Sequence, residues 1–186
     1  LYSPVDVPPA DNSAMDGYAL AHKDANLEVN YVVSDRIPAG YVGEKLAFGS
    51  VARIFTGALI PDGADTVVMQ ENVLLTKGQV NLLELPKQFQ NIRFKGQDIE
   101  KGSLIVSKGD LLSARTLSLV ASVGLAEVEV VKPLKIAIMS TGDELVEPGG
   151  EITPGKIYSS NRYVLSGMLR TMGMSVIDLG IVADTP

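Results

Sequence analysis

The apolar residues of this chain follow two successive patterns, and the change between them near Leu111 constrains the fold more than any other feature. Before it, short apolar runs are separated by glycine and proline at intervals typical of strands and turns. After it, a helical repeat leads to Pro133, and then to an apolar run, a polar loop, a second helical repeat and another apolar run. The sequence therefore predicts a mixed α and β fold, in which a β-rich region is followed by the start of a parallel α/β unit.

The first region contains the runs that predict strands. Leu27, Val29, Tyr31 and Val33 alternate with polar residues, which is the period of a strand with one buried face, and Pro38 ends this run. Further strands are predicted from the runs SVARIFT, DTVVMQENVLL, QVNLLEL and SLIVSKG. Short strands at this spacing favour a small barrel or a sandwich.

Two helices are predicted in the second region. The run LSARTLSLVASVGLAEV predicts a helix that Ser113 caps and Gly124 ends. The run NRYVLSGMLRTMG predicts a second helix, with Asn161 as its cap and Gly173 as its end. Its predicted apolar stripe consists of Leu165, Met168, Leu169 and Met172. The helix lies between KIAIMS and MSVIDLGIV, whose near-continuous apolar character predicts buried parallel strands.

Both ends of the sequence indicate a piece of a longer protein. The chain begins at Leu1 without a methionine and without a signal-like start. Two parallel strands would expose most of the apolar faces that such strands normally bury, so we expect the natural domain to continue beyond Pro186.

The composition excludes several classes of protein. The 186 residues carry a formal net charge of -6, so no stripe of lysine and arginine is available to neutralise nucleic-acid phosphates. The longest apolar run, TLSLVASVGLA, is too short to span a membrane. With no cysteine and one histidine, the chain offers neither a disulfide framework nor a His-rich metal site. We expect a soluble protein, compatible with a reducing cytoplasm, that binds neither nucleic acid nor membrane.

Polar residues gather at the ends of apolar runs in the stretches DNSAMDGYAL, FTGALIPDGAD, FKGQDIEKG and STGDELVEPG. Each pairs a glycine with a carboxylate or hydroxyl, a combination that suits an oxyanion or a cation. For Asp11, Asn12 and Asp16, the alternative to a ligand contact is an Asx-type turn before a strand. For Thr56 and Gly57, the alternative is a hairpin loop.

The other two stretches leave similar alternatives open. Asp98 follows Arg93 and Lys95, so a solvated turn competes with a binding site there. Asp143 and Glu144 come directly after a predicted parallel strand, and loops at the carboxyl ends of such strands bind ligands in open α/β sheets. The alternative for this acidic pair is a solvated loop or the first turn of a helix.

Taken in order, these stretches closely resemble the MoeA family, the molybdopterin molybdenumtransferases, which include the E domain of gephyrin. The resemblance covers essentially the whole chain. The segments that carry it are DNSAMDGYAL, RIFTGALIPDGADTVVMQE, IRFKGQDIEKG, KIAIMSTGDELVEPG and GKIYSSNRYVLSGMLRTMG. Leu59 stands where the family usually has proline, and we expect this to change the stiffness of the loop rather than its chemistry.

The resemblance implies a domain organisation. Residues 1–16 and 93–132 correspond to part of the family's linker domain, residues 17–92 to its inserted β-rich, barrel-like domain, and residues 133–186 to the truncated start of its molybdopterin-binding α/β domain. Members of the family are homodimers whose active-site cleft lies between the β-rich domain of one subunit and the α/β domain of the other.

The resemblance also implies an activity in molybdenum cofactor biosynthesis, which we expect in the cytoplasm. The parent enzyme would insert molybdate into adenylated molybdopterin and release AMP. We expect residues 1–186 alone to be inactive, because the remainder of the α/β domain and its substrate-binding residues would be missing. The alternative is a dimeric scaffold or binding module with the same fold and no catalysis.

Carried over residue by residue, the resemblance assigns roles to the polar loops. The implied catalytic residues are Asp11, Thr56, Asp98 and Glu144, and the implied substrate-binding residues are Asp16, Gly57, Gly142 and Asp143. Because clustered carboxylates would repel molybdate and a pyrophosphate, the resemblance implies Mg²⁺ as cofactor, with Asp98 and Glu144 as its ligands. Arg53, Arg93 and Lys95 are candidate anion contacts from sequence proximity.

Overall fold

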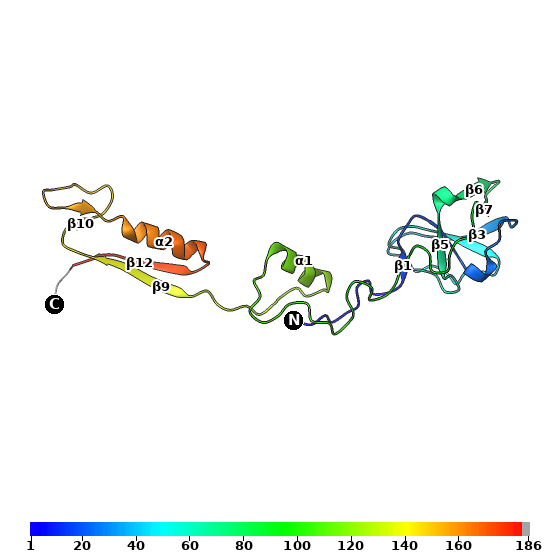
Figure 1. Cartoon of the computed structure of the whole chain (residues 1–186), viewed down its shortest axis with the longest axis horizontal. Coiled ribbons are helices and arrows are strands. Elements are labelled where there is room, and N and C mark those ends of the chain that lie inside the picture. Colours follow the sequence, from blue (N-terminus) through cyan, green and yellow to red (C-terminus); the bar gives the residue numbers. More distant parts are fainter. Residues whose placement is uncertain (184–186) are drawn as a thin grey trace. The chain divides into compact units, whose positions relative to one another are not determined.

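The structure is a computed structural model that describes residues 1–183 (Figure 1). Contacts divide the chain into two compact units, residues 1–127 and the described residues from 128 onward. The strands are β1 (Asn12–Ser13), β2 (Gly17–Leu20), β3 (Tyr31–Ile37), β4 (Ser50–Ile54), β5 (Thr66–Met69), β6 (Val73–Thr76), β7 (Gln79–Leu82), β8 (Ile92–Arg93), β9 (Lys135–Thr141), β10 (Leu145–Val146), β11 (Ile157–Tyr158) and β12 (Ser175–Val182). The helices are α1 (Ala114–Ser122), α2 (Asn161–Thr171) and the 3-10 helices η1 (His22–Asp24) and η2 (Gln70–Asn72). Within the described residues, no helix has the length and apolar character needed to cross a membrane.

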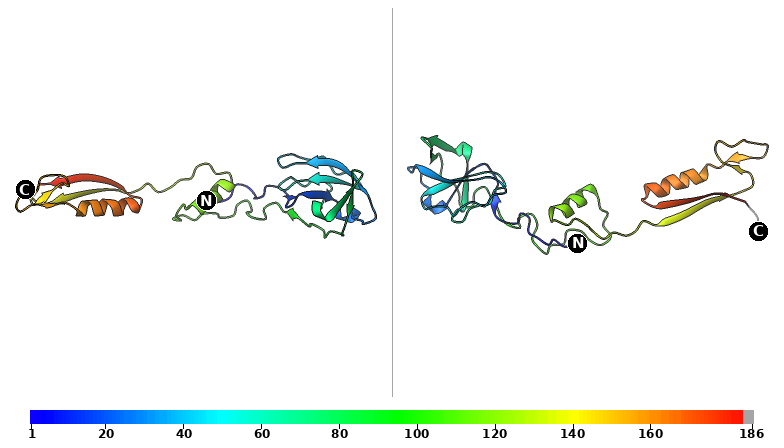
Figure 2. Two further views of the ribbon diagram at one scale, coloured as in Figure 1. Left: turned by 90° about the horizontal axis from the view of Figure 1, so that it is seen from above. Right: turned by 180° about the vertical axis from the view of Figure 1, so that it is seen from behind.

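The first unit is built on a six-stranded sheet with the strand order β5-β2-β4-β3-β7-β6. β3 and β4 are parallel, and the other neighbouring strands are antiparallel. β5 and β6 form opposite edges of the sheet, yet only η2 separates them in sequence, so the sheet must curl to bring its edges close. The curled half-barrel is visible in Figure 2 and confirms the predicted barrel-like fold of the β-rich region.

The curled sheet has apolar residues on both faces. One buried cluster consists of Tyr18, Leu20, Tyr31, Val51, Val68, Val80 and Leu82. The other consists of Ala19, Ile37, Ala52, Ile54, Ala58 and Val67. Because side chains alternate along a strand, Tyr18 and Leu20 of β2 belong to the first cluster and Ala19 to the second. β2 therefore anchors the turn that precedes it, which carries Asp11 and Asp16.

Two of the strand predictions need correction at their ends. Leu27 and Val29 were expected on the inner face of a strand, but they precede β3 and are 46% and 36% exposed. The hydroxyl of Tyr31 accepts from the Asn26 amide at 2.7 Å and donates to the Asp24 carbonyl at 2.6 Å, which bends this segment into a loop. The run DTVVMQENVLL forms two strands, β5 and β6, rather than one.

The prediction of a strand in SLIVSKG is wrong. Residues 103–109 form a single isolated bridge, between Leu104 and Tyr2, and Leu104 is 57% exposed. The N-terminal segment runs beside this part of the chain with a second isolated bridge, Val7 to Ile99, and with the short β1–β8 pair. Because these segments pair only at single positions, they form no continuous ladder of backbone hydrogen bonds.

The first predicted helix is confirmed as α1. The Ser113 side chain accepts from the Thr116 amide at 3.3 Å, as expected of an N-cap. Gly124 has φ +80°, the left-handed conformation that commonly ends a helix.

The second unit contains the predicted strand–helix–strand arrangement. β9 and β12 are parallel neighbours, and α2 lies along them (Figure 1). β10 and β11 form a separate parallel pair. The expectation of buried strands is wrong for the described residues, because alternate residues of β9 are exposed. A two-stranded sheet with one helix covers only part of each strand.

The register of α2 also differs from the prediction. The cap position is Ser160 rather than Asn161, and its side chain makes no capping hydrogen bond. Of the predicted apolar stripe, Leu165, Met168 and Met172 are 51%, 58% and 68% exposed. The less exposed face instead consists of Arg162, Ser166 and Leu169. Gly173 ends the helix as predicted, with φ +80°.

Candidate functional site

The structure brings Asp16, Thr56 and Gly57 together at one end of the β-rich sheet. Asp16 Oδ1 accepts from both the amide and the hydroxyl of Thr56, each at 2.8 Å. The Gly57 amide donates to the Ser13 carbonyl at 2.8 Å, and Gly57 has φ +81°. Fully buried Ala58 anchors the next position in the core. The loop TGA is therefore held against the turn DNSAMD by its backbone and by one carboxylate.

The carboxylate of Asp16 is committed to this contact. Hydrogen bonds from the Thr56 amide and hydroxyl hold the pKa of the Asp16 carboxyl below its usual value, and the positive charge of Arg53 lowers it further by a smaller amount. Because the Thr56 hydroxyl proton points to Asp16, the hydroxyl oxygen is left as an acceptor. In this arrangement Thr56 can accept a hydrogen bond from a ligand but cannot donate one.

Asp11 lies outside that contact and lines an open cavity of about 460 Å³. One oxygen of its carboxylate accepts from the Lys95 amide at 2.8 Å, and its carbonyl accepts from the Ile60 amide at 3.1 Å. Lys45, Asp62 and Lys95 also line the cavity, which therefore presents both signs of charge. An exposed carboxylate held at one oxygen keeps its second oxygen for a ligand.

Asp98 forms an ion pair with Arg93, and both side chains are nearly half exposed. Its amide donates to the Val7 carbonyl at 2.9 Å, which fixes the turn on the N-terminal segment. Asp98 lines a second hollow, of about 380 Å³, together with Glu100 and Leu104. At this exposure the ion pair contributes about 0–1 kcal/mol to stability, so its consequence is the orientation of Asp98.

The three candidate anion contacts have protein partners. Arg93 pairs with Asp98, and the Lys95 ammonium lies 3.3 Å from Asp6. The Arg53 guanidinium donates to the carbonyls of Gly17 and Ile54 and to Gln70, at 2.8, 3.0 and 2.6 Å. It also lies over the rings of Tyr18 and Phe55. The Arg53 guanidinium is thus occupied by protein partners, whereas Lys95 lines the cavity with Asp11.

Gly142, Asp143 and Glu144 lie in the loop that follows β9 in the second unit. Gly142 has φ +146°, and a Cβ there would lie 2.5 Å from Glu144 Oε2. The Glu144 carboxylate thus folds back over the glycine, a position that no larger residue would permit. The Glu144 carbonyl accepts from the Ile157 amide at 2.8 Å, and the Lys156 ammonium donates to the Asp143 carbonyl. These bonds fix the loop backbone on the segment around β11.

The predicted Mg²⁺ ligands belong to different units, Asp98 to the first and Glu144 to the second. Among the described residues, no group of three or more His, Cys, Asp or Glu could hold a metal. Hard carboxylate oxygens nevertheless fit Mg²⁺, which commonly takes one or two carboxylates and completes its shell with water and substrate oxygens.

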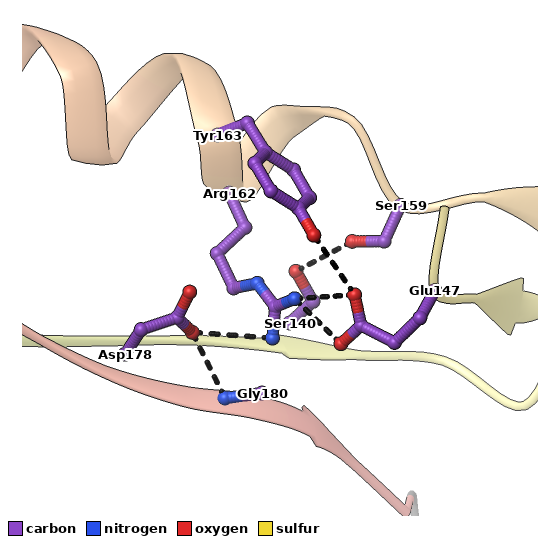
Figure 3. A network of polar contacts seen from close by, with 7 residues as sticks. All are labelled: Ser140, Glu147, Ser159, Arg162, Tyr163, Asp178 and Gly180. Atoms are coloured by element: carbon purple, nitrogen blue, oxygen red, sulfur yellow. Dashed lines mark hydrogen bonds and ion pairs between the residues drawn. The ribbon is translucent and has the colours of Figure 1, made fainter. Parts of the chain in front are cut away.

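Sequence reasoning missed a polar network around Arg162, which Figure 3 shows in close view. Arg162 Nη2 donates to both oxygens of the Glu147 carboxylate, at 2.5 and 2.6 Å, and Nη1 lies 3.1 Å from Asp178 Oδ1. Hydrogen bonding to Glu147 raises the pKa of the Arg162 guanidinium above its ordinary value, against the effect of burial. The signal in the sequence was the i, i+4, i+7 spacing that places Arg162 on one face with Ser166 and Leu169.

Comparison with known proteins matches both units of the chain. Residues 1–124 match the family model described as "MoeA N-terminal region (domain I and II)", and residues 137–186 match the model described as "Probable molybdopterin binding domain". A molybdopterin molybdenumtransferase of Haemophilus influenzae is 43% identical over 186 residues, covering 99% of this chain and 46% of that protein. A protein of the same name from Nostoc is 39% identical over 190 residues, covering 99% of this chain and 44% of its own length.

Solved structures give the same match. A molybdopterin biosynthesis MoeA protein from Pyrococcus horikoshii aligns with a TM-score of 0.90 at 31% identity, covering 100% of this chain and 51% of that one. A second Pyrococcus MoeA structure aligns with a TM-score of 0.87 at 37% identity, covering 99% and 49%. The chain spans about half the length of the relatives it matches.

Proposed function

The chain belongs to the MoeA family, and on that premise we propose that the full-length protein inserts molybdate into adenylated molybdopterin and releases AMP, as a step of molybdenum cofactor biosynthesis. The observation that carries this proposal is the 43% identity, along 99% of the chain, to a relative named molybdopterin molybdenumtransferase. We propose the activity for the full-length protein only, with residues 1–186 inactive by themselves, because the chain spans about half of that relative. A homodimer in the cytoplasm belongs to the same proposal.

In the proposed site, Thr56 and Asp11 orient the substrate. The Thr56 hydroxyl donates its hydrogen bond to Asp16, so Thr56 would accept from a ring N–H or a sugar hydroxyl of the substrate. Asp11 keeps one carboxylate oxygen for a substrate proton or hydrogen bond, since the Lys95 amide holds the other. Gly57 would allow the backbone to approach the substrate closely, because it carries no side chain, whereas the space beside Gly142 holds the Glu144 carboxylate.

Asp98 and Glu144 would hold Mg²⁺ in this site. The ion, when bound, would offset the charge of the anionic substrates and polarise the phosphoanhydride. Arg93 orients Asp98 through their ion pair, and Gly142 leaves room for the Glu144 carboxylate. Asp143 and Asp16 would support the substrate through the backbone segments that they fix.

The proposal can be tested by measuring AMP release. Full-length protein is incubated with adenylated molybdopterin and molybdate, and AMP is separated chromatographically, with and without Mg²⁺. We expect release that EDTA abolishes, and losses of about 10²-fold or more in Asp98→Asn and Glu144→Gln, because each change removes one charge from the reacting centre. Glu151→Gln, a change of the same kind at an exposed residue, serves as the matched control.

Four results would count against the proposal. AMP release that does not depend on molybdate would indicate simple hydrolysis of the adenylate. Wild-type rates in both Asp98→Asn and Glu144→Gln would remove these residues from the site. No release by a correctly folded full-length protein would favour the scaffold alternative, and a native mass of one chain would exclude the homodimer.

A further inference from the structure

Arg162 is a charged residue with only 4% of its side chain exposed. It lies in the first turn of α2, on the face that packs on β9 and β12 (Figure 3). Its guanidinium is shared between Glu147, which it contacts at both carboxylate oxygens, and Asp178 on β12. One buried side chain therefore links three segments of the second unit: α2, β12 and the residue that follows β10.

The link to the loop is made at two points. Beside the contact that Arg162 Nη2 makes with both oxygens of Glu147, the Tyr163 hydroxyl donates to Glu147 Oε2 at 3.2 Å. The loop is continuous with β9 at Gly142 and is attached to α2 at Glu147. Between these ends lie Asp143, Glu144 and the two residues of β10, so attachment at Glu147 holds β10 from its far end and thereby restricts where Glu144 can lie.

β12 is shaped to receive the guanidinium. The pairing of β9 with β12 shifts register between Asp178 and Ile181, and Gly180 within this shift has φ +78°. The Gly180 amide donates to Asp178 Oδ1 at 3.0 Å, which directs that carboxylate at Arg162. A Cβ on Gly180 would lie 3.3 Å from Arg162 Nη1, so the glycine leaves the space that the guanidinium fills.

The network is a poor means of stabilising the unit. Arg162 Nε is buried without a hydrogen-bond partner among the described residues, which adds to the cost of burying the charge. The carboxylates of Glu147 and Asp178 are 47% and 40% exposed, and ion pairs with partners so exposed contribute little to stability. A guanidinium that donates from Nη2 to both oxygens of Glu147 and from Nη1 to Asp178, in contrast, fixes the directions of all three side chains. The geometry is thus better suited to holding the loop in place than to stability.

We infer that Arg162 is a positioning residue, which acts through Glu147 to hold the loop of Gly142, Asp143 and Glu144 in place. The effect on catalysis rests on the proposed function, in which Glu144 acts on the substrate. The effect on the loop itself does not rest on it, and can be measured without substrate.

The test compares variants of the full-length protein. The double variant Arg162→Met with Glu147→Met removes the positioning contact without leaving a charge unpaired at Glu147, and Asp178 is 40% exposed and stays solvated. Arg162→Lys keeps the charge but has one nitrogen in place of the two that contact Glu147 and Asp178 separately. Glu151→Gln removes a charge from the same loop, where the side chain has no partner among the described residues, and is the matched control.

Three quantities are measured for each variant: unfolding by denaturant, amide hydrogen exchange of residues 142–147, and kcat and KM for AMP release. For the double variant we expect wild-type unfolding and amide exchange about tenfold faster in the loop. We expect its kcat to fall by about 10²-fold, with KM changed by less than about threefold, because a small displacement of a catalytic group costs rate more than binding. Arg162→Lys should likewise show faster amide exchange in the loop and a lower kcat than the wild-type protein.

Each contrary result has a defined meaning. Slow amide exchange of the loop in the double variant overturns the inference. So does wild-type exchange with a wild-type rate in Arg162→Lys, because a positive charge alone would then be sufficient. Fast exchange with wild-type kcat overturns the link to catalysis. If the wild-type protein releases no AMP, the proposed function fails, while the exchange measurement still decides whether Arg162 positions the loop.

Discussion

Substitution of Gly142 by alanine tests how the loop after β9 presents Glu144. The new Cβ would lie 2.5 Å from Glu144 Oε2, whereas ordinary contact begins at 3.4 Å, so the carboxylate has to move by about 1 Å. Glu144 is the far end of a flexible side chain and can move, so the fold should survive. The positive φ of +146° adds backbone strain, which costs about 1–3 kcal/mol.

The expected result is a loss of activity much larger than the loss of stability accounts for. A displacement of about 1 Å at a reacting group costs about 10²-fold in rate. We would measure AMP release and unfolding by denaturant in the full-length protein. Gly155→Ala is the matched control, because Gly155 has φ +87° and no atom within 4 Å of the added Cβ. Gly155→Ala should lose stability through backbone strain and keep the wild-type rate of AMP release.

The reasoning is refuted if Gly142→Ala retains the wild-type rate, since Glu144 would then not need its present position. It is equally refuted if Gly155→Ala loses as much activity as Gly142→Ala. Backbone strain in the loop, and not the position of the carboxylate, would then explain both variants.

Three other predictions concern stability. Hydrogen bonds from Thr56 lower the pKa of the Asp16 carboxyl in the folded protein, so Asp16 stabilises the fold above the unfolded carboxyl pKa of about 4, and this stabilisation is lost as pH falls through the lower folded pKa. The difference in unfolding free energy between wild type and Asp16→Asn should therefore shrink in acid, and a difference that does not change with pH would contradict this. Gly17→Ala places a Cβ 2.0 Å from the Val68 carbonyl oxygen and should destabilise by about 3 kcal/mol in denaturant unfolding, because β2 and β5 must separate. Gly167→Ala in α2 meets no atom within 4 Å and should stabilise by up to about 1 kcal/mol, so a loss of stability there would show that the helix needs a glycine.

Local features were predicted well where the signal lies within one segment. Ser113 caps α1 and Gly124 ends it, since both act on backbone groups within a few residues. The order of strand, helix and strand around α2 follows from the period of the apolar residues. The four polar stretches sufficed to identify the family, because their residues and spacing are read directly from the chain.

Predictions failed where the outcome depends on a partner segment. SLIVSKG has the composition of a strand, but its neighbour pairs with it only at Leu104. Met168 and Met172 have helical spacing, but the two-stranded sheet beneath α2 leaves them exposed. In both cases the residues have the expected local preference, and the available neighbour decides whether they are buried.

For this protein, the sequence by itself determined the class of most elements, though not of the SLIVSKG run, and the motifs that mark the family, because propensity, capping and spacing act over a few residues. Only the tertiary structure decided which polar groups meet. Asp16 and Thr56 are 40 residues apart, and Glu147 and Arg162 are 15 apart. Hydrogen bonds and ion pairs act over about 3 Å, so such contacts exist only once the backbone has brought distant segments together.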